Sequence, residues 1–127
     1  HDNSVVSLWT KVPEYGKQIC ICSSLKDALC LWANTGIPCL AVQGEGYGMS
    51  DTAINELKQR YKHVFVCFDN DEAGLADGKK FSELTGFINV VLPHFNEGKD
   101  CSDLYHSLQD QKKFKDIMIG LFKEKIV

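Results

Sequence analysis

The stretch VFVCFDNDEAG, residues 64–74, decides the fold, because an unbroken apolar run passes directly into an acidic turn and a helix-forming segment. The apolar part, residues 64–68, is too short for a helix and shows no polar alternation, which is typical of a strand that a parallel sheet buries on both faces. Asp69 and Asp71 follow where the chain leaves the sheet, and ligands of open parallel sheets bind at this end. The stretch therefore predicts a site at the carboxyl edge of a sheet.

The same alternation of strand and helix continues on both sides of this stretch. Strands are predicted at residues 19–22, 38–42, 64–68 and 88–92, separated by three helices, and one or two short helices follow at the C-terminus. Each connection is long enough for a right-handed crossover. We therefore predict the α/β class, with about four parallel strands and helices on both faces of the sheet.

The spacing of apolar residues also predicts which helix faces pack on the sheet. In the first helix the predicted stripe is Leu25, Ala28, Leu29 and Trp32, and in the third it is Ala73, Ala76, Lys80 and Leu84 with Phe81 beside them.

Length and composition point to one ordinary globular domain of 127 residues. Residues 1–18 are expected to be a linker or the cut edge of a longer chain, residues 19–108 the domain, and residues 109–127 a C-terminal helix packing on the domain or extending from it. A net charge of -3 supplies no basic field for strong nucleic-acid binding by this piece alone. No apolar run approaches the ~18 residues that cross a bilayer. Five of the six cysteines sit in apolar runs, so a reduced cytoplasmic setting is expected.

The acidic turn has two readings from its residues alone. Two carboxylates at i and i+2 repel one another unless a cation matches them, and Mg²⁺ commonly takes one or two protein carboxylates together with water. The alternative is a solvated turn in which Asn70 or Asp71 caps the third helix. An EF-hand loop is excluded because its twelfth position requires glutamate, whereas this chain has Lys80 there.

Three segments together resemble the Toprim domains of DNA primases, especially those of phage primase-helicases. Residues 68–74 resemble the D-x-D-x-A-G signature, and residues 19–31 are similar to the first Toprim motif, with Asp27 on its final acidic position. Residues 93–104, which contain Gly98 to Leu104, resemble the K-D-x-x-D-L ending found in primases. The resemblance covers residues 19 to about 105 and implies a Toprim, Rossmann-like fold.

The first motif departs from the family, because Ser23 and Ser24 stand where the family has glutamate and glycine. An uncharged hydroxyl binds a cation or moves a proton less well than a carboxylate. Two outcomes stay open: the site has lost activity, or Glu45, after the second strand, replaces the missing acid. Divergent phage Toprim domains resemble the second pattern.

The resemblance implies a primase fragment that binds Mg²⁺ or Mn²⁺ for RNA primer synthesis. It implies metal and catalytic roles for Asp69 and Asp71, with Glu45 as their substitute partner. Supporting or phosphate-binding roles are expected for Asp27, Ser23, Lys99 and Asp100, although Asp100 and Asp103 also suit helix capping.

The implied partners are nucleoside triphosphates, a single-stranded DNA template in the full-length protein, and a fused or associated replicative helicase, in the cytoplasm of a bacterium or an infected host cell. The isolated fragment is expected to be inactive or nearly so. The alternatives are a catalytically degenerate module that binds metal, nucleotide or a partner, and a Toprim nuclease or topoisomerase.

Overall fold

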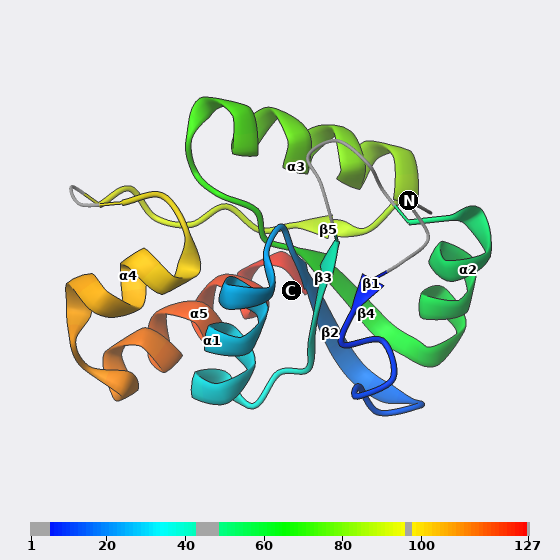
Figure 1. Cartoon of the computed structure of the whole chain (residues 1–127), viewed down its shortest axis with the longest axis horizontal. Helices are drawn as coiled ribbons and strands as arrows, with labels where there is room; N and C mark the ends of the chain where they lie inside the picture. Colours follow the sequence, from blue (N-terminus) through cyan, green and yellow to red (C-terminus); the bar gives the residue numbers. More distant parts are fainter. Residues whose placement is uncertain (1–5, 43–48, 96–97, 127) are drawn as a thin grey trace.

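The computed structural model of this chain describes residues 6–42, 49–95 and 98–126 and shows one five-stranded sheet with helices around it (Figure 1). The strand order is β1-β3-β2-β4-β5; the last four strands are parallel and β1 is antiparallel to β3. The predicted α/β class and four-stranded parallel sheet are therefore confirmed. In chain order the elements are β1 (Val6–Ser7), β2 (Gly16–Cys22), α1 (Leu25–Thr35), β3 (Cys39–Val42), α2 (Asp51–Arg60), β4 (Tyr61–Val66), α3 (Glu72–Thr85), β5 (Ile88–Asn89), α4 (Cys101–Leu108) and α5 (Gln111–Ile126).

The strand boundaries differ from the predicted ones where backbone pairing outweighs the side-chain pattern. Strand β2 starts at Gly16, three residues before the apolar run, because Gly16 and Gln18 pair with Tyr61 and His63 of β4. Strand β4 in turn begins directly after α2 ends at Arg60. Short β1 was not predicted. The paired length therefore differs from the apolar stretch in both directions: β2 extends beyond it, whereas β5 covers only Ile88–Asn89 of the predicted residues 88–92.

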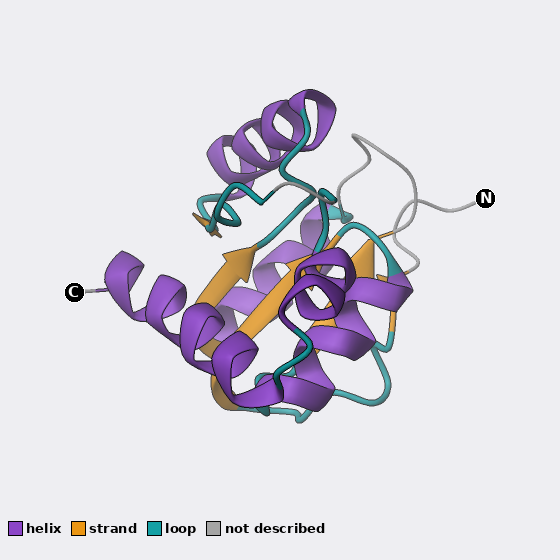
Figure 2. Ribbon diagram, turned by 90° about the vertical axis from the view of Figure 1, so that its left-hand side faces the viewer, coloured by secondary structure: helices purple, strands orange, loops and turns teal. Residues whose placement is uncertain are grey.

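Alternate residues of the central strand β2 belong to two separate hydrophobic cores, one on each face of the sheet. Cys20 and Cys22 point into the core under α1, α4 and α5, whereas Ile19 and Ile21 point into the core under α2 and α3. Figures 1 and 2 show these helices on the two sides of the strands. Helices therefore cover both faces of the sheet, as predicted.

The predicted helix faces were wrong in part. Leu25 and Leu29 of α1 are 45% and 49% exposed, and Leu84 of α3 is 76% exposed. The buried side of α1 is centred on Ala28 and Leu31 instead, and that of α3 contains Gly78, Phe81 and Thr85. The stripe was predicted from apolar periodicity alone, whereas the side of each helix that faces the sheet mixes small and polar residues with large apolar ones.

Both end segments contact the rest of the fold. Arg60 holds the N-terminal segment by donating from Nε to the carbonyl of Glu14 at 2.7 Å and from Nη2 to that of Pro13 at 2.8 Å. At the other end, Phe114 and Met118 of α5 are fully buried. The division of the chain at residues 18 and 108 stays a prediction.

The six cysteines are free thiols, and five of them are buried. Burial raises the pKa of the Cys20 and Cys39 thiols, so these side chains serve as small apolar groups, as the sequence predicts. Among the described helices, none is both long and apolar enough to cross a membrane.

Candidate metal centre

Three helix N-termini meet at the carboxyl edge of the sheet, each closed by a short polar side chain. Ser24 caps α1 by accepting from the amide of Asp27, Asp71 caps α3 by accepting from Gly74, and Asp100 caps α4 by accepting from Asp103. These caps satisfy amides that would otherwise lack partners, and the positive ends of helices favour nearby anions. The edge is therefore built to hold negative side chains.

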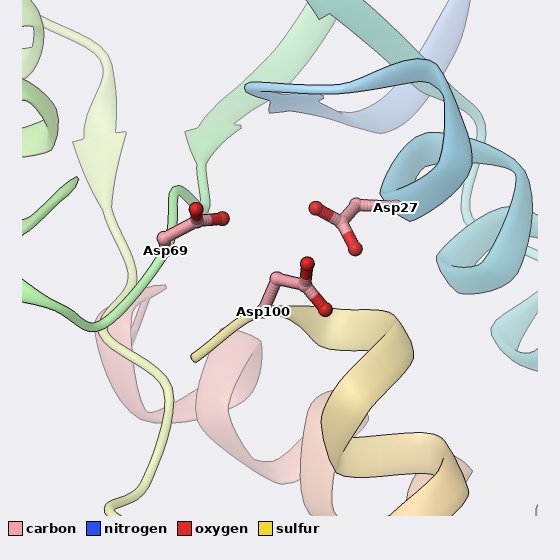
Figure 3. A group of neighbouring side chains, drawn as sticks. All are labelled: Asp27, Asp69 and Asp100. Carbon is pink, nitrogen blue, oxygen red and sulfur yellow. The ribbon is translucent and has the colours of Figure 1, made fainter. Parts of the chain in front are cut away.

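Three aspartates from distant parts of the sequence converge there. Asp27, Asp69 and Asp100 each offer a carboxylate oxygen, and these oxygens all lie within 4.8 Å of one another. Figure 3 shows the three side chains pointing toward one another from α1, from the end of β4 and from the start of α4. We refer to these three residues as the aspartate cluster.

Asp27 is the most rigidly held member of the cluster. It is 3% exposed; its Oδ2 accepts from the Ser24 hydroxyl at 2.9 Å and its Oδ1 from the Ser102 amide at 3.1 Å. Burial raises the pKa of Asp27, and the two hydrogen bonds oppose that rise. A carboxylate this deep, next to two others, is placed at an energetic cost that a bound cation would remove.

Asp69 has the fewest protein partners in the cluster. Its described side-chain hydrogen bond comes from the Ser23 hydroxyl to Oδ1, at 3.4 Å. Burial, followed by the charges of Asp27 and Asp100, raises the pKa of Asp69 to about 6. Asp69 is thus the carboxylate most open to a new ligand.

Lysines pair with the acids at the rim. Lys26 Nζ lies 3.3 Å from Asp100 Oδ2, and Lys99 Nζ lies 3.2 Å from Asp71 Oδ2. Both lysines are more than half exposed. They therefore carry positive charge beside the cluster without filling it.

The sequence-based site residues fall into three groups. The first group consists of residues that lie together: Ser23, Asp27, Asp69 and Asp100. Supporting roles were expected for Asp27 and Asp100, but their carboxylates lie directly beside that of Asp69. Asp71 lies outside the aspartate cluster: the Gly74 amide and Lys99 occupy its oxygens and lower its pKa. The alternative reading, in which Asp71 caps the third helix, is confirmed, and a ligand role for it stays a prediction.

Glu45 lies outside the described residues, so its role as a substitute ligand also stays a prediction. Sequence reasoning missed Ser102, whose amide anchors Asp27 and whose buried hydroxyl has no hydrogen-bond partner among the described atoms. It also treated Lys26 as solvated. The sequence carries no signal for either contact, because both join segments about 75 positions apart.

The donor set fits a small divalent cation. Oxygens on opposite sides of an octahedral Mg²⁺ lie about 4 Å apart, and the ion usually keeps several waters. Three carboxylate oxygens within 4.8 Å therefore suit direct binding by some and water-mediated binding by the others. The set is also all oxygen, which favours Mg²⁺ or Mn²⁺ over softer metals.

The cluster opens into a cavity of about 510 Å³, a size within the usual range for small-molecule sites. Gly74 and Leu84 of α3 both line it. These residues are ten positions apart on one helix, so the cavity extends about 15 Å along α3. The site thus has room for a ligand much larger than a metal ion.

Residues 20–105 match the family model described as Toprim-like. Among curated proteins, the uncharacterized protein MG010 of Mycoplasma genitalium is 41% identical over 64 aligned positions, covering 47% of this chain and 29% of that protein.

Among solved structures, the primase fragment of the bacteriophage T7 primase-helicase protein has a TM-score of 0.68 at 16% identity, covering 91% of this chain and 49% of that one. A chain from the T7 lagging-strand DNA polymerase assembly with primase domains, an RNA/DNA hybrid and dTTP has a TM-score of 0.63 at 16% identity, covering 96% and 61%. At this identity the likeness is one of fold, and this chain spans less than two thirds of each of these three proteins.

Proposed function

The chain belongs to the Toprim-like family, and on that premise we propose that it binds Mg²⁺ or Mn²⁺ at the aspartate cluster as the catalytic core of a DNA primase. The observation that carries the proposal is the convergence of Asp27, Asp69 and Asp100, three acids from three segments, with oxygens within 4.8 Å. Like charges this close oppose one another unless a cation is present. The likeness of the fold to T7 primase domains supports the choice of reaction, and the cluster supplies the place for the ion.

Different residues of the chain would bind the ion, position its ligands and contact the phosphates. Asp69 would bind the ion directly, while Ser24 and the Ser102 amide hold Asp27 in position beside it. When bound, the ion would neutralise the triphosphate of an incoming nucleotide and assist attack by a 3′-hydroxyl. Lys26 and Lys99 stand at the rim, where each can exchange its aspartate for a phosphate oxygen.

The substrates of the proposed reaction are nucleoside triphosphates on a single-stranded DNA template, with an RNA primer as the product. The matched T7 structures are of primase domains, one of them with an RNA/DNA hybrid and dTTP, which supports this choice. A net charge of -3 gives this chain no overall basic field that would hold a template. We therefore propose that another part of a longer cytoplasmic protein binds the template, that a replicative helicase is fused to that protein or associates with it, and that this piece alone is inactive.

A second candidate is a Toprim module that has lost catalysis and keeps metal or nucleotide binding. The observation that favours it is Ser23, whose hydroxyl contacts Asp69 at 3.4 Å, where the family motif has a glutamate. The variant Ser23→Glu tests this candidate, because it returns a carboxylate to the cluster. If Ser23 marks a degenerate site, Mg²⁺ should bind the variant at least roughly 10-fold more tightly; equal affinity would show that the serine costs the site nothing.

Calorimetric titration with Mg²⁺ and Mn²⁺ tests the main proposal. We expect Asp69→Asn to abolish binding and Asp71→Asn to retain it, because the oxygens of Asp71 are already engaged. Glu45→Gln decides whether that residue is a substitute ligand. The control is Asp116→Asn, which removes an exposed acid on α5. Unchanged binding in Asp69→Asn would end the proposal.

A further inference from the structure

The cavity beside the aspartate cluster has a second, apolar half that the metal does not need. We call this half the apolar lobe and define it by the lining residues Val42, Met49, Ile54, Phe68, Phe81 and Leu84. We propose that the apolar lobe binds the base of a nucleoside triphosphate whose phosphates reach the cluster. This inference rests on the proposed function, and it assigns that function a specific binding surface between α2 and α3.

The lobe and the cluster are joined through consecutive residues at the end of β4. Phe68 packs on the core under α2 and α3, and its neighbour Asp69 belongs to the cluster on the other side. A ligand that bridges them would therefore contact an aromatic ring at one end and a metal-binding carboxylate at the other. A nucleoside triphosphate has this polarity, with a flat apolar base and a chain of anions.

The aromatic wall of the lobe suits a flat ring. Phe68 and Phe81 stack with ring centroids 5.8 Å apart and planes inclined by 21°, and both line the cavity. Bases stack on aromatic side chains with an affinity that depends little on base identity. This wall therefore favours a base over an aliphatic side chain of another domain.

Charge sets the direction of the ligand. Asp51, Asp77 and Lys80 line the cavity near the apolar lobe, so acids outnumber bases there. The two acids would repel phosphates and accept hydrogen bonds from the amino groups of a base. Lys26 lines the cavity beside the cluster and attracts phosphates. With a cation bound at the cluster, the phosphates therefore belong there and the base at the lobe.

Leu84 is a suitable position for testing the apolar lobe by mutation. It lines the cavity yet is 76% exposed, so its replacement leaves the cores intact. Leu75 provides a matched control, because it lies on the same helix, is 40% exposed and is not part of the cavity wall. Leu84→Gln and Leu75→Gln thus differ mainly in whether they touch the lobe.

The experiment compares the affinities of ATP and inorganic tripolyphosphate by calorimetry at a fixed excess of Mg²⁺. The two probes share a triphosphate chain, and only ATP carries a base. We expect ATP to bind the 127-residue chain roughly 10-fold more tightly, from stacking alone. We expect Leu84→Gln to weaken ATP binding about 3-fold or more and to leave tripolyphosphate unchanged, with Leu75→Gln like the unaltered chain. Ile54→Gln, on the opposite wall, should repeat the effect.

The outcomes distinguish failure of base binding at the lobe from failure of metal binding at the cluster. Equal affinities for ATP and tripolyphosphate, or a Leu84→Gln variant that keeps full ATP affinity, would overturn the base-binding lobe while metal binding stood. Absence of Mg²⁺ binding would overturn the proposed function, and this inference with it.

Discussion

Removing one charge from the aspartate cluster should stabilise the metal-free protein. In the folded chain the pKa of Asp69 is about 6, against an ordinary value of 3.8. A difference of about 2 units corresponds to roughly 3 kcal/mol of destabilisation, which we reduce to about 1.5 kcal/mol because Asp69 is only partly buried and solvent screens it. Asp69→Asn keeps the shape and removes the charge, so it should raise the free energy of unfolding at pH 7.5 by that amount.

The pH dependence follows from the direction of the shift. Because the folded state binds the Asp69 proton more tightly than the unfolded state, the metal-free chain loses stability as the pH rises from about 4 to about 6. Asparagine has no such titration. The advantage of the variant should therefore shrink to about 0.5 kcal/mol at pH 4.5, where Asp69 is mostly protonated in the folded chain.

Urea unfolding followed by circular dichroism measures both effects, with and without Mg²⁺. At an Mg²⁺ concentration about 100-fold above its dissociation constant, the unaltered chain should gain about 2.7 kcal/mol and the variant nothing, so their order reverses. Asp116→Asn, at an exposed acid on α5, should change stability by less than about 0.5 kcal/mol in every condition. An Asp69→Asn variant that is no more stable than the unaltered chain at pH 7.5 without metal would refute the reasoning.

Two further predictions concern the backbone. Gly74→Ala should destabilise the chain by more than about 2 kcal/mol, because the added Cβ would overlap the carbonyl of Asp69. A Cβ added at Gly120 meets no atom within 4 Å, so Gly120→Ala should stabilise α5 by about 0.5–1 kcal/mol. Thermal unfolding of both variants measures this difference, and equal effects would contradict it. Arg60→Lys keeps the charge but loses the two hydrogen bonds to the carbonyls of Pro13 and Glu14. It should lower the free energy of unfolding by about 1–2 kcal/mol in urea unfolding, and an unchanged midpoint would show that these hydrogen bonds contribute little.

The order of strands and helices was predictable because an apolar run lies in or next to each parallel strand. Helix orientation was harder to predict, since the apolar stripes at Leu29 and Leu84 looked as good as the buried ones. Gly78 of α3 lies close to Asn89 of β5, where an added Cβ would come within 3.1 Å of the Asn89 side-chain oxygen, and that contact is visible only when both elements are placed.

The candidate site was predictable in its location and only partly in its composition. Asp69 was identified because it follows a buried strand directly. Asp27 and Asp100 were expected to play supporting roles, since nothing in the sequence shows that segments so far apart meet at one point. Asp71 shows the opposite case: its spacing from Asp69 suggested a shared ion, while in the structure it caps α3 and pairs with Lys99.

Helix capping by Asp71 and Asp100 has an evolutionary consequence. A descendant of this chain that no longer needed a metal would still need both side chains to begin α3 and α4, since losing an N-cap typically costs about 1 kcal/mol. Selection for folding alone would then preserve part of the acidic pattern. Asp69 caps no helix, so its loss or retention among descendants should report on metal use more faithfully than that of its neighbours.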